Sequence, residues 1–350
     1  MLKELKKAYS LLGDDLSRQI FINRLGFMSA TQIGSEYTEE GMNCFSRMLK
    51  LADLDVSDLK IKIGDAPVIV YGIGYCSYLF TAFFKAYFPN KEIAAYCDKR
   101  NNEVPQFFGK KVLSIKQVKE MFSNAVIIIS PNYVKDEIVS ELRQNGIVDD
   151  RIVFDYNKLI TTFNDEYFDE VLNFSENEVF VDAGCCNCTN SLDFIKRCPS
   201  YEKIYAFEPD SNSYLTCKQV IRDKAISNIE LHDCGLWNKK DTATFGGNGC
   251  PHIDSNGEQT IKLDTLDDIV NGAKVTFIKM DIEGSELNAL HGAKNTIVSN
   301  KPKLAICIYH KPDDIWELPL YIHELVPEYK MYIRHYSAKA CSTILYATIE

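Results

Sequence analysis

Residues 178–184, which read Glu-Val-Phe-Val-Asp-Ala-Gly, decide the fold. A run of strand-forming residues ends there in an acid, and Gly184 then lets a ligand approach the backbone closely at the carboxyl end of the strand. Residues 203–210, Lys-Ile-Tyr-Ala-Phe-Glu-Pro-Asp, repeat the pattern and place Glu208 at the end of the next strand. This order is typical of nucleotide-binding α/β sheets, in which the second acid accepts hydrogen bonds from ribose hydroxyls. The alternative is that Gly184 forms a turn and Glu208 caps the following helix.

Further strands alternate with helices around this pair. A helix is expected over residues 164–174, and the strands that follow are expected at residues 178–182, 203–208, 229–232, 276–281, 303–309, 330–334 and 343–347. Only a short loop separates the last two strands, which suits an antiparallel hairpin and not a crossover. The pattern predicts an α/β fold with a seven-stranded sheet that is parallel except for this terminal hairpin.

A dense acidic stretch follows the fourth of these strands. Residues 279–286 read Lys-Met-Asp-Ile-Glu-Gly-Ser-Glu. Asp281 and Glu283 leave the carboxyl end of a strand, where they can orient a substrate hydroxyl, accept its proton or hold a divalent cation. The alternative is a helix capped by Ser285 with acids in its first turn. Capping accounts for Glu286, but it does not require the acid at position 281.

The first 160 residues carry weaker signals. Residues 1–64 show helical spacing of apolar residues without any chemical cluster, and we interpret them as a packing or oligomerisation element. Residues 65–160 alternate strands with helices, which predicts a smaller Rossmann-like α/β domain. The loop Gly72-Ile-Gly74, with Asp98 further on, has two glycines of a dinucleotide fingerprint and lacks the third. Binding of a nucleotide or nucleotide-linked sugar and a purely scaffolding role both stay open.

Composition excludes several classes of protein. The 350 residues are 46% hydrophobic and 25% charged, which excludes a disordered chain or a collagen-like repeat. The formal net charge of −10 disfavours a general nucleic-acid binder. The sequence shows neither a signal peptide nor an apolar run long enough to cross a bilayer, so we expect a cytoplasmic protein without stable membrane insertion. Its 12 cysteines should then stay reduced.

Three of these cysteines lie together at Cys185, Cys186 and Cys188. A structural zinc or other soft-metal site needs about four ligands with suitable spacing. We take this run to lack paired C-x-x-C spacing, and Cys198 would have to fold back to join it, so no metal site is predicted. Small residues that pack in a crowded loop are the favoured interpretation. A low-pKa thiol at a helix start is a second one.

The second half of the sequence resembles the FkbM-family methyltransferases. The resemblance covers about residues 178–347 and rests on motifs that occur in the family's order, namely Val-Asp-Ala-Gly at 181–184, Ala-Phe-Glu-Pro-Asp at 206–210, Gly-Leu-Trp at 235–237, Leu-Asp-Thr-Leu-Asp-Asp at 263–268, Ile-Lys-Met-Asp-Ile-Glu-Gly-Ser-Glu at 278–286, Leu-His-Gly-Ala at 290–293, Ile-Tyr-His-Lys-Pro at 308–312 and Arg-His-Tyr at 334–336. It implies a class I Rossmann-like methyltransferase domain over residues 161–350. It also implies O-methyl transfer from S-adenosylmethionine to a hydroxyl of a sugar, a glycan precursor or a secondary metabolite.

The resemblance also assigns roles to individual residues. Asp182 and Gly184 are implied to line the methionine end of the cofactor, Glu208 to hold its ribose hydroxyls, and Asp233 and Gly235 to lie near its adenine. Ala183, Asn187 and Pro209 are also implied to bind the cofactor. Asp281, Glu283 and His310 would face the reacting centre. The family usually has a second glycine after Gly184, and if Cys188 occupies that position, its Cβ would crowd the cofactor.

The implied mechanism is in-line attack by a substrate oxygen on the sulfonium methyl group. The protein would orient the reactants and supply a base, for which His310 and Asp281 are the candidates. His335 lies in an aromatic hairpin and is expected to be structural. Two other functions stay open: a protein that binds a nucleotide or nucleotide sugar through its N-terminal domain, and a catalytically silent assembly module. A homo-oligomer formed through the N-terminal region is a further expectation.

Overall fold

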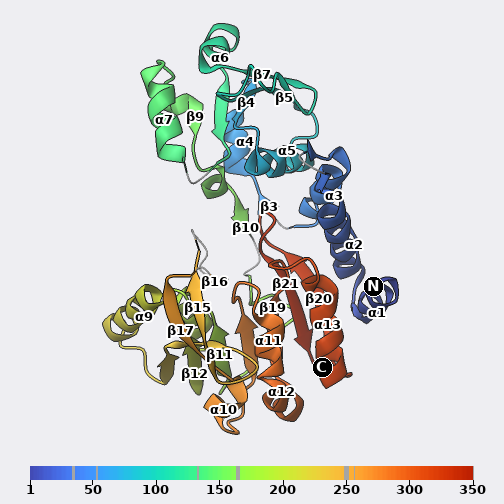
Figure 1. The fold of residues 1–350 in the computed structure, drawn as a ribbon, viewed down its shortest axis with the longest axis vertical. Coiled ribbons are helices and arrows are strands. Elements are labelled where there is room, and N and C mark those ends of the chain that lie inside the picture. Colours follow the sequence, from blue (N-terminus) through green and yellow to red (C-terminus); the bar gives the residue numbers. More distant parts are fainter. Residues whose placement is uncertain are drawn as a thin grey trace. The chain divides into compact units, whose positions relative to one another are not determined.

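The computed structural model (Figure 1) describes residues 1–33, 36–52, 54–131, 134–162, 166–247, 252–255 and 257–349. The chain forms two compact units. Unit 1 comprises Met1–Phe21, Asn164–Arg334 and Cys341–Glu350, and unit 2 comprises Ile22–Phe163 and His335–Ala340.

The helices of residues 1–64, where a helical segment is expected, are divided between the two units. They are α1 (Leu2–Leu11), α2 (Asp15–Ala30), α3 (Glu39–Leu49) and α4 (Ser57–Ile63). In unit 1, α1 packs against α13 (Asp314–Leu325), and the backbone N–H of Gly13 donates to the carbonyl oxygen of Met331 at 2.7 Å. In unit 2, α3 packs against α5 (Tyr75–Tyr87). Their apolar faces are therefore divided between the two units.

Unit 1 is built on the predicted seven-stranded sheet. Its strands, in spatial order, are β13 (Ile229–His232), β12 (Lys203–Phe207), β11 (Val179–Ala183), β18 (Phe277–Met280), β19 (Lys303–Cys307), β21 (Thr343–Thr348) and β20 (Lys330–His335). The first five are parallel, and β21 runs antiparallel to β19. This arrangement confirms the class I Rossmann-like methyltransferase fold. From β11 the chain first adds β12 and β13 on one side, and later adds β18 and β19 on the other side. The carboxyl ends of β11, β12 and β18 therefore form the switch point of the sheet.

The helices of unit 1 are α8 (Thr189–Arg197), α9 (Ser211–Asp223), α10 (Leu266–Val270), α11 (Glu286–His291), α12 (Lys294–Asn300) and α13. The helix expected over residues 164–174 is wrong for residues 166–174, which form turns, a bend and irregular backbone. Residues 164 and 165 lie outside the described residues. Two local features account for the difference. Tyr167 has a left-handed φ of 71°, and the Asp169 carboxylate accepts the backbone N–H of Val171 at 3.0 Å.

A second, smaller sheet lies between β13 and β18 in the sequence, and the sequence analysis did not predict it. Its order is β14 (Cys234–Leu236), β17 (Gln259–Asp264), β15 (Asp241–Gly246) and β16 (His252–Ile253). Phe245, Ile261 and Leu263 form a buried apolar cluster on this sheet. Gln259 also donates to the carbonyl oxygen of Pro209 at 3.2 Å, which joins β17 to the end of β12.

Unit 2 contains the predicted smaller α/β sheet. Its strands, in spatial order, are β6 (Gln106–Phe107), β7 (Lys110–Leu113), β5 (Ile93–Cys97), β4 (Val68–Tyr71), β8 (Val126–Ile129) and β9 (Ile152–Val153), and all adjacent pairs are parallel except β6 with β7. The remaining elements of the unit are α6 (Ile115–Met121), α7 (Lys135–Gln144), the 3₁₀ turns Asp149–Arg151 and Tyr156–Leu159, and two short antiparallel pairs, β1 (Gln32–Ile33) with β2 (Glu36–Tyr37) and β3 (Leu54–Asp55) with β10 (Thr161–Thr162).

His335 belongs to unit 2, where its buried ring packs edge-on against Phe45. Burial lowers the pKa of His335 to about 3, which agrees with the structural role expected for it. Within the described part of the chain, no helix combines the length and the apolar character needed to cross a membrane.

A buried ion pair joins the two central strands of unit 1. The Lys279 ammonium on β18 lies 3.1 Å from the Asp182 carboxylate on β11, and both side chains are at most 1% exposed. Asp182 also accepts the hydroxyl of Ser191 at 2.7 Å. Lys279 donates to the carbonyl oxygens of Ala183 and Gly184, at 3.1 and 2.7 Å. The ammonium group therefore holds the backbone exactly where β11 ends and the following loop begins.

Replacing Lys279 tests how strongly the fold depends on this pair. Lys279→Met leaves the Asp182 charge buried without a partner, so we expect the free energy of unfolding to fall by about 3–5 kcal/mol. The exposed pair Lys301–Glu328 supplies the control, because Lys301→Met should cost about 1 kcal/mol or less. Urea unfolding followed by circular dichroism measures both variants. Equal losses in the two would contradict the role given to Lys279.

Candidate active site

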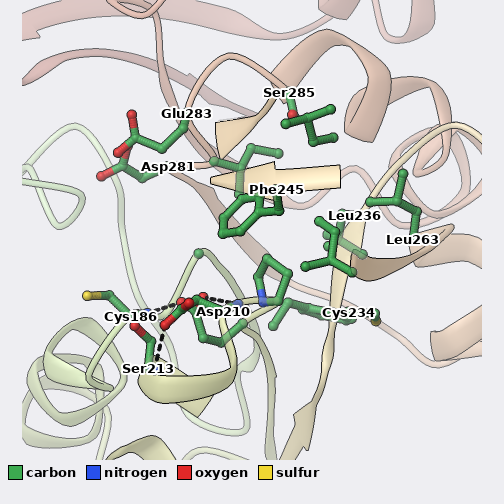
Figure 2. Close-up of a pocket in the computed structure, with 18 residues that line it drawn as sticks. Cys186, Asp210, Ser213, Cys234, Leu236, Phe245, Leu263, Asp281, Glu283 and Ser285 are labelled. Carbon is green, nitrogen blue, oxygen red and sulfur yellow. Dashed lines mark hydrogen bonds between the residues drawn. The ribbon is translucent and has the colours of Figure 1, made fainter. Parts of the chain in front are cut away.

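A cavity opens at the carboxyl ends of β11, β12 and β18, at the switch point of the sheet. It is lined by Gly184, Cys186, Phe207, Glu208, Pro209, Asp210, Ser213, Cys234, Gly235, Leu236, Phe245, Ile253, Ile261, Leu263, Asp281, Ile282, Glu283 and Ser285. Figure 2 shows Asp281 and Glu283 at one side of this cavity and Leu236 and Leu263 at the other. The cavity thus has an acidic side and an apolar side.

Gly184 lies just after β11, against the backbone of Asp281 at the end of β18. Its φ is 74°, in the left-handed region that favours glycine. A Cβ at this position would overlap the carbonyl oxygen of Asp281. Both its N–H and that of Cys185 donate to the carbonyl oxygen of Phe207, at 3.1 and 3.0 Å. The glycine is therefore required for the close approach of three strand ends.

Glu208 presents a buried carboxylate from the end of β12. Its two oxygens accept the backbone N–H groups of Cys186 and Asp210, at 2.8 and 2.9 Å. The helix cap at this end of α9 is Asp210, which accepts the N–H of Ser213, so Glu208 is not the cap. Burial raises the pKa of Glu208 to about 7 against the lowering effect of the two N–H donors. The remaining lone pairs of this carboxylate can accept further hydroxyl donors in the cavity.

The other residues predicted to bind a cofactor are distributed unevenly. Pro209 and Gly235 line the cavity. Ala183 and Asp182 are buried and do not line the cavity, and the Asp182 carboxylate forms an ion pair with Lys279. Asn187 accepts the N–H and hydroxyl of Thr189 at the start of α8, and the largely exposed carboxylate of Asp233 forms an ion pair with Lys262 at 2.7 Å. The structure therefore does not bring Asn187 or Asp233 into the cavity.

Asp281 is held by two tyrosines that the sequence analysis did not identify. The hydroxyl of Tyr167 donates to one carboxylate oxygen at 2.7 Å, and that of Tyr309 donates to the other at 3.0 Å. Burial alone would raise the pKa of Asp281, but the charge of Lys279, the Tyr167 hydrogen bond and the charge of His310 lower it below its usual range. Asp281 is thus a fixed anion and a weak base.

His310 lies at the centre of three carboxylates. Its Nε2 is 3.4 Å from an oxygen of Asp281 and 3.4 Å from an oxygen of Glu283, and its Nδ1 is 3.0 Å from Glu286. Burial would lower the pKa of His310, but the hydrogen bond and charge of Glu286 and the other two charges raise it above its ordinary value. Burial also raises the pKa of Glu283, which makes it a stronger base than Asp281. The structure therefore brings Asp281, Glu283 and His310 together, and their catalytic role stays a prediction.

Glu286 lies in the first turn of α11, as helix capping implies, but its side chain makes contacts that capping does not require. It is fully buried, and its carboxylate accepts the backbone N–H of Ile282 at 3.0 Å in addition to contacting His310. Ser285 occupies the cap position of α11 without a side-chain cap hydrogen bond. Asp281, Glu286 and His310 place one ligand atom each within 4.8 Å of one another, close enough to hold a divalent cation as well as a proton.

The cysteine loop does not obstruct the cavity. Cys188 precedes α8 with a left-handed φ of 61°, a conformation in which glycine is unstrained. Its side chain is fully buried and lies with those of Cys185 and Cys217, and it does not line the cavity. Thiol hydrogen bonds from Cys185 and Cys217 lower the pKa of Cys188 to about 5. The expected crowding by its Cβ is therefore not seen, because the side chain points into the protein.

Comparison with protein families matches residues 182–337 to the methyltransferase FkbM domain. This part of the chain is similar to the FkbM methyltransferases. The match begins at Asp182 on β11 and extends beyond β20, so it covers the whole cavity with its acidic cluster. The chain therefore carries a methyltransferase.

One solved structure supports the fold, and two others are weaker matches. The crystal structure of methyltransferase FkbM from Methylobacillus flagellatus KT has a TM-score of 0.51 and 21% sequence identity over 87% of this chain and 98% of that chain. An rRNA methylase from Streptococcus thermophilus has a TM-score of 0.34 and 17% identity, covering 50% of this chain and 89% of its own. A SAM-dependent methyltransferase from Aquifex aeolicus has a TM-score of 0.31 and 14% identity, covering 51% and 85%. Comparison with curated proteins found no match.

A second cleft lies in unit 2, outside the FkbM domain. Gly72, Gly74, Asp98 and Arg100 are among the residues that line it. Gly72 is left-handed with a φ of 108°, as expected for the glycine loop. Asp98, the acid of the expected fingerprint, accepts two hydrogen bonds from the Arg100 guanidinium, at 3.0 and 3.2 Å. A ribose would have to compete with Arg100 for this carboxylate, and nucleotide binding here stays a prediction.

The protonation of His310 tests the electrostatics of the FkbM domain. Because three carboxylates surround the imidazole, an NMR titration should give His310 a midpoint above its ordinary value of about 6.5. Glu286→Gln removes the Nδ1 partner's charge and should shift the midpoint to lower pH. Glu324→Gln, on the exposed face of α13, is the control and should leave it unchanged. A midpoint that does not respond to Glu286→Gln would contradict the assigned contact.

Proposed function

We propose that the FkbM domain uses S-adenosylmethionine to methylate a hydroxyl group. The observation that carries the proposal is one continuous cavity with Glu208 on its wall and Asp281 and Glu283 at its acidic side. A carboxylate at the end of the second strand suits a ribose diol. The apolar side, formed by Phe245, Ile261 and Leu263, suits a flat aromatic base. These residues fit the cofactor.

The acidic side of the cavity supports transfer to oxygen. S-adenosylmethionine, when bound, supplies an electrophilic methyl group on a positively charged sulfur. Asp281 and Glu283 favour a positive charge in the cavity and accept a hydrogen bond from an acceptor hydroxyl. Glu283 lines the cavity and has the higher pKa of the two, so it takes the hydroxyl proton. His310 lies behind it at 3.4 Å and stabilises its charge, while Tyr167 and Tyr309 keep Asp281 in place.

The acceptor that we propose is a small molecule, a sugar or glycan precursor or a secondary metabolite. The FkbM resemblance and the hydroxyl-binding acids support this class. The net charge of −10 argues against a nucleic-acid acceptor. Since Cys188 faces away from the cavity, the loop gives no support to a catalytically silent module.

Cofactor binding tests the first part of the proposal. Titration calorimetry with S-adenosylhomocysteine should give a Kd that rises about 5- to 150-fold in Glu208→Ala, because buried hydroxyls lose their acceptor. Since the pKa of Glu208 is about 7 and its ionised form accepts the hydroxyls, the wild-type Kd should also rise about tenfold from pH 8 to pH 6. Glu208→Gln should lose this pH dependence.

Asp233→Ala is the matched control for this titration. The Asp233 carboxylate pairs with Lys262 outside the cavity, so the Kd of this variant for S-adenosylhomocysteine should stay within about twofold of the wild-type value. A folded protein that does not bind S-adenosylhomocysteine, or equal effects of Glu208→Ala and Asp233→Ala, would contradict the cofactor assignment.

Methyl transfer tests the second part. We expect the protein with a labelled methyl donor and extracted glycans or small metabolites to yield a product that carries the label on oxygen. Glu283→Gln should lower kcat by about 10²- to 10⁴-fold and leave the Kd for S-adenosylhomocysteine within about twofold. A parallel reaction with EDTA shows whether a divalent cation is needed. Label found on nitrogen or carbon, or an unchanged kcat in Glu283→Gln, would contradict the mechanism.

A further inference from the structure

Three thiols meet beneath the loop that follows β11. Cys185 and Cys188 belong to the loop, and Cys217 comes from the middle of α9. All three side chains are fully buried, and their sulfur atoms lie within 4.8 Å of one another. The Sγ atoms of Cys185 and Cys217 are 3.6 Å apart. The methyltransferase mechanism uses none of them.

The cysteines of this cluster differ from the set Cys185, Cys186, Cys188 and Cys198, for which no metal site was predicted from the sequence. Cys185 and Cys188 are themselves separated by two residues, which is the C-x-x-C spacing of many soft-metal sites. The third sulfur comes from Cys217 and not from Cys198, which lies at the far end of α8. Because Cys217 is on the next helix of the fold, no local sequence pattern indicates it.

The distances match those of sulfur atoms around one metal ion. Four thiolates at the usual Zn–S distance of about 2.3 Å are about 3.8 Å from one another in a tetrahedron. The Cys185 and Cys217 sulfurs are 3.6 Å apart and the other two separations are at most 4.8 Å, so the cluster needs only a small adjustment. The Cys217 thiol donates to the carbonyl oxygen of Cys186 at 3.0 Å, so this oxygen lies beside the cluster.

Two features near the loop favour negative charge at Cys188, whereas thiol hydrogen bonds to Cys188 and burial raise the pKa of Cys185 and Cys217. Cys188 precedes the first turn of the nine-residue helix α8, whose N–H groups point toward this end. The buried Lys279 ammonium donates to the carbonyl oxygen of Gly184, the residue before Cys185. Cys188 has a left-handed backbone conformation that would suit glycine better.

We propose that Cys185, Cys188 and Cys217 bind one soft, closed-shell metal ion such as Cu⁺ or Zn²⁺. Thiolates select these ions over Mg²⁺ and Ca²⁺. The ion ties the loop of Gly184 and Cys186 to α9. Because Cys186 donates to Glu208, the bound ion keeps the cofactor-facing backbone in order without contacting the cofactor.

The metal content of the reduced protein tests this site. Purified protein is incubated with Zn²⁺ or with Cu⁺, freed of excess ion, and analysed by mass spectrometry of the elements. We expect about one ion per chain. Direct competition between Zn²⁺ and Cu⁺ then shows which ion the site prefers. Cobalt(II) should give a thiolate-to-metal absorption band. Failure to retain any of these ions would overturn the proposal.

Three variants make the test specific. Cys188→Gly removes one ligand and suits the left-handed backbone, so it should fold and lose at least about 90% of the bound ion. Cys217→Ala should lose it as well. Cys198→Ala, which changes another buried cysteine of α8, should keep about one ion per chain. Retention of the ion by folded Cys188→Gly would overturn the proposal.

A second measurement separates a metal site from a redox pair. If the wild-type protein holds no ion but peptide mass spectrometry finds Cys185 joined to Cys217, the cluster forms a disulfide and the proposal is wrong. We expect instead that the loaded ion protects these three thiols from alkylation, while Cys186, which is exposed, still reacts.

Discussion

The buried contact between Lys279 and Asp182 sets the geometry of the methyltransferase unit. It joins the two central strands where the chain order of the sheet reverses, and the same ammonium group donates to the carbonyl oxygens of Ala183 and Gly184. A charge without its partner at this depth would be strongly unfavourable. The pair therefore fixes how the ends of β11 and β18 meet, and the left-handed turn at Gly184 follows from that constraint.

The two sides of the cavity follow from these strand ends. β12 delivers Glu208, and β18 delivers Asp281 and Glu283, so groups 73 or more residues apart in sequence line one space. Two tyrosines and the Lys279 charge keep Asp281 ionised, whereas burial keeps Glu283 more basic. Two neighbouring acids thus have different chemical properties, one suited to holding a hydroxyl and the other to receiving its proton.

Much of this architecture could be predicted from the sequence, because strand residues and their terminal acids are local signals. The strands of the large sheet, Gly184, Glu208 and the Asp281–Glu283 pair are of this kind. Tyr167 could not be predicted, because it reaches Asp281 from a turn 114 residues earlier. Glu286 resembled an ordinary helix-start acid. The small sheet with Phe245 was detectable in the sequence, because polar and apolar residues alternate in its strands Asp241–Gly246 and Gln259–Asp264.

A crystal structure of the protein with S-adenosylhomocysteine tests the central claim most directly, because it shows where the cofactor lies. Our account predicts that both ribose hydroxyls lie within hydrogen-bonding distance of the Glu208 carboxylate. It also predicts the adenine against Phe245 and Leu263 and the sulfur facing Asp281 and Glu283. A cofactor bound in the cleft beside Gly72 and Asp98, with the cavity at Glu208 empty, would contradict the account.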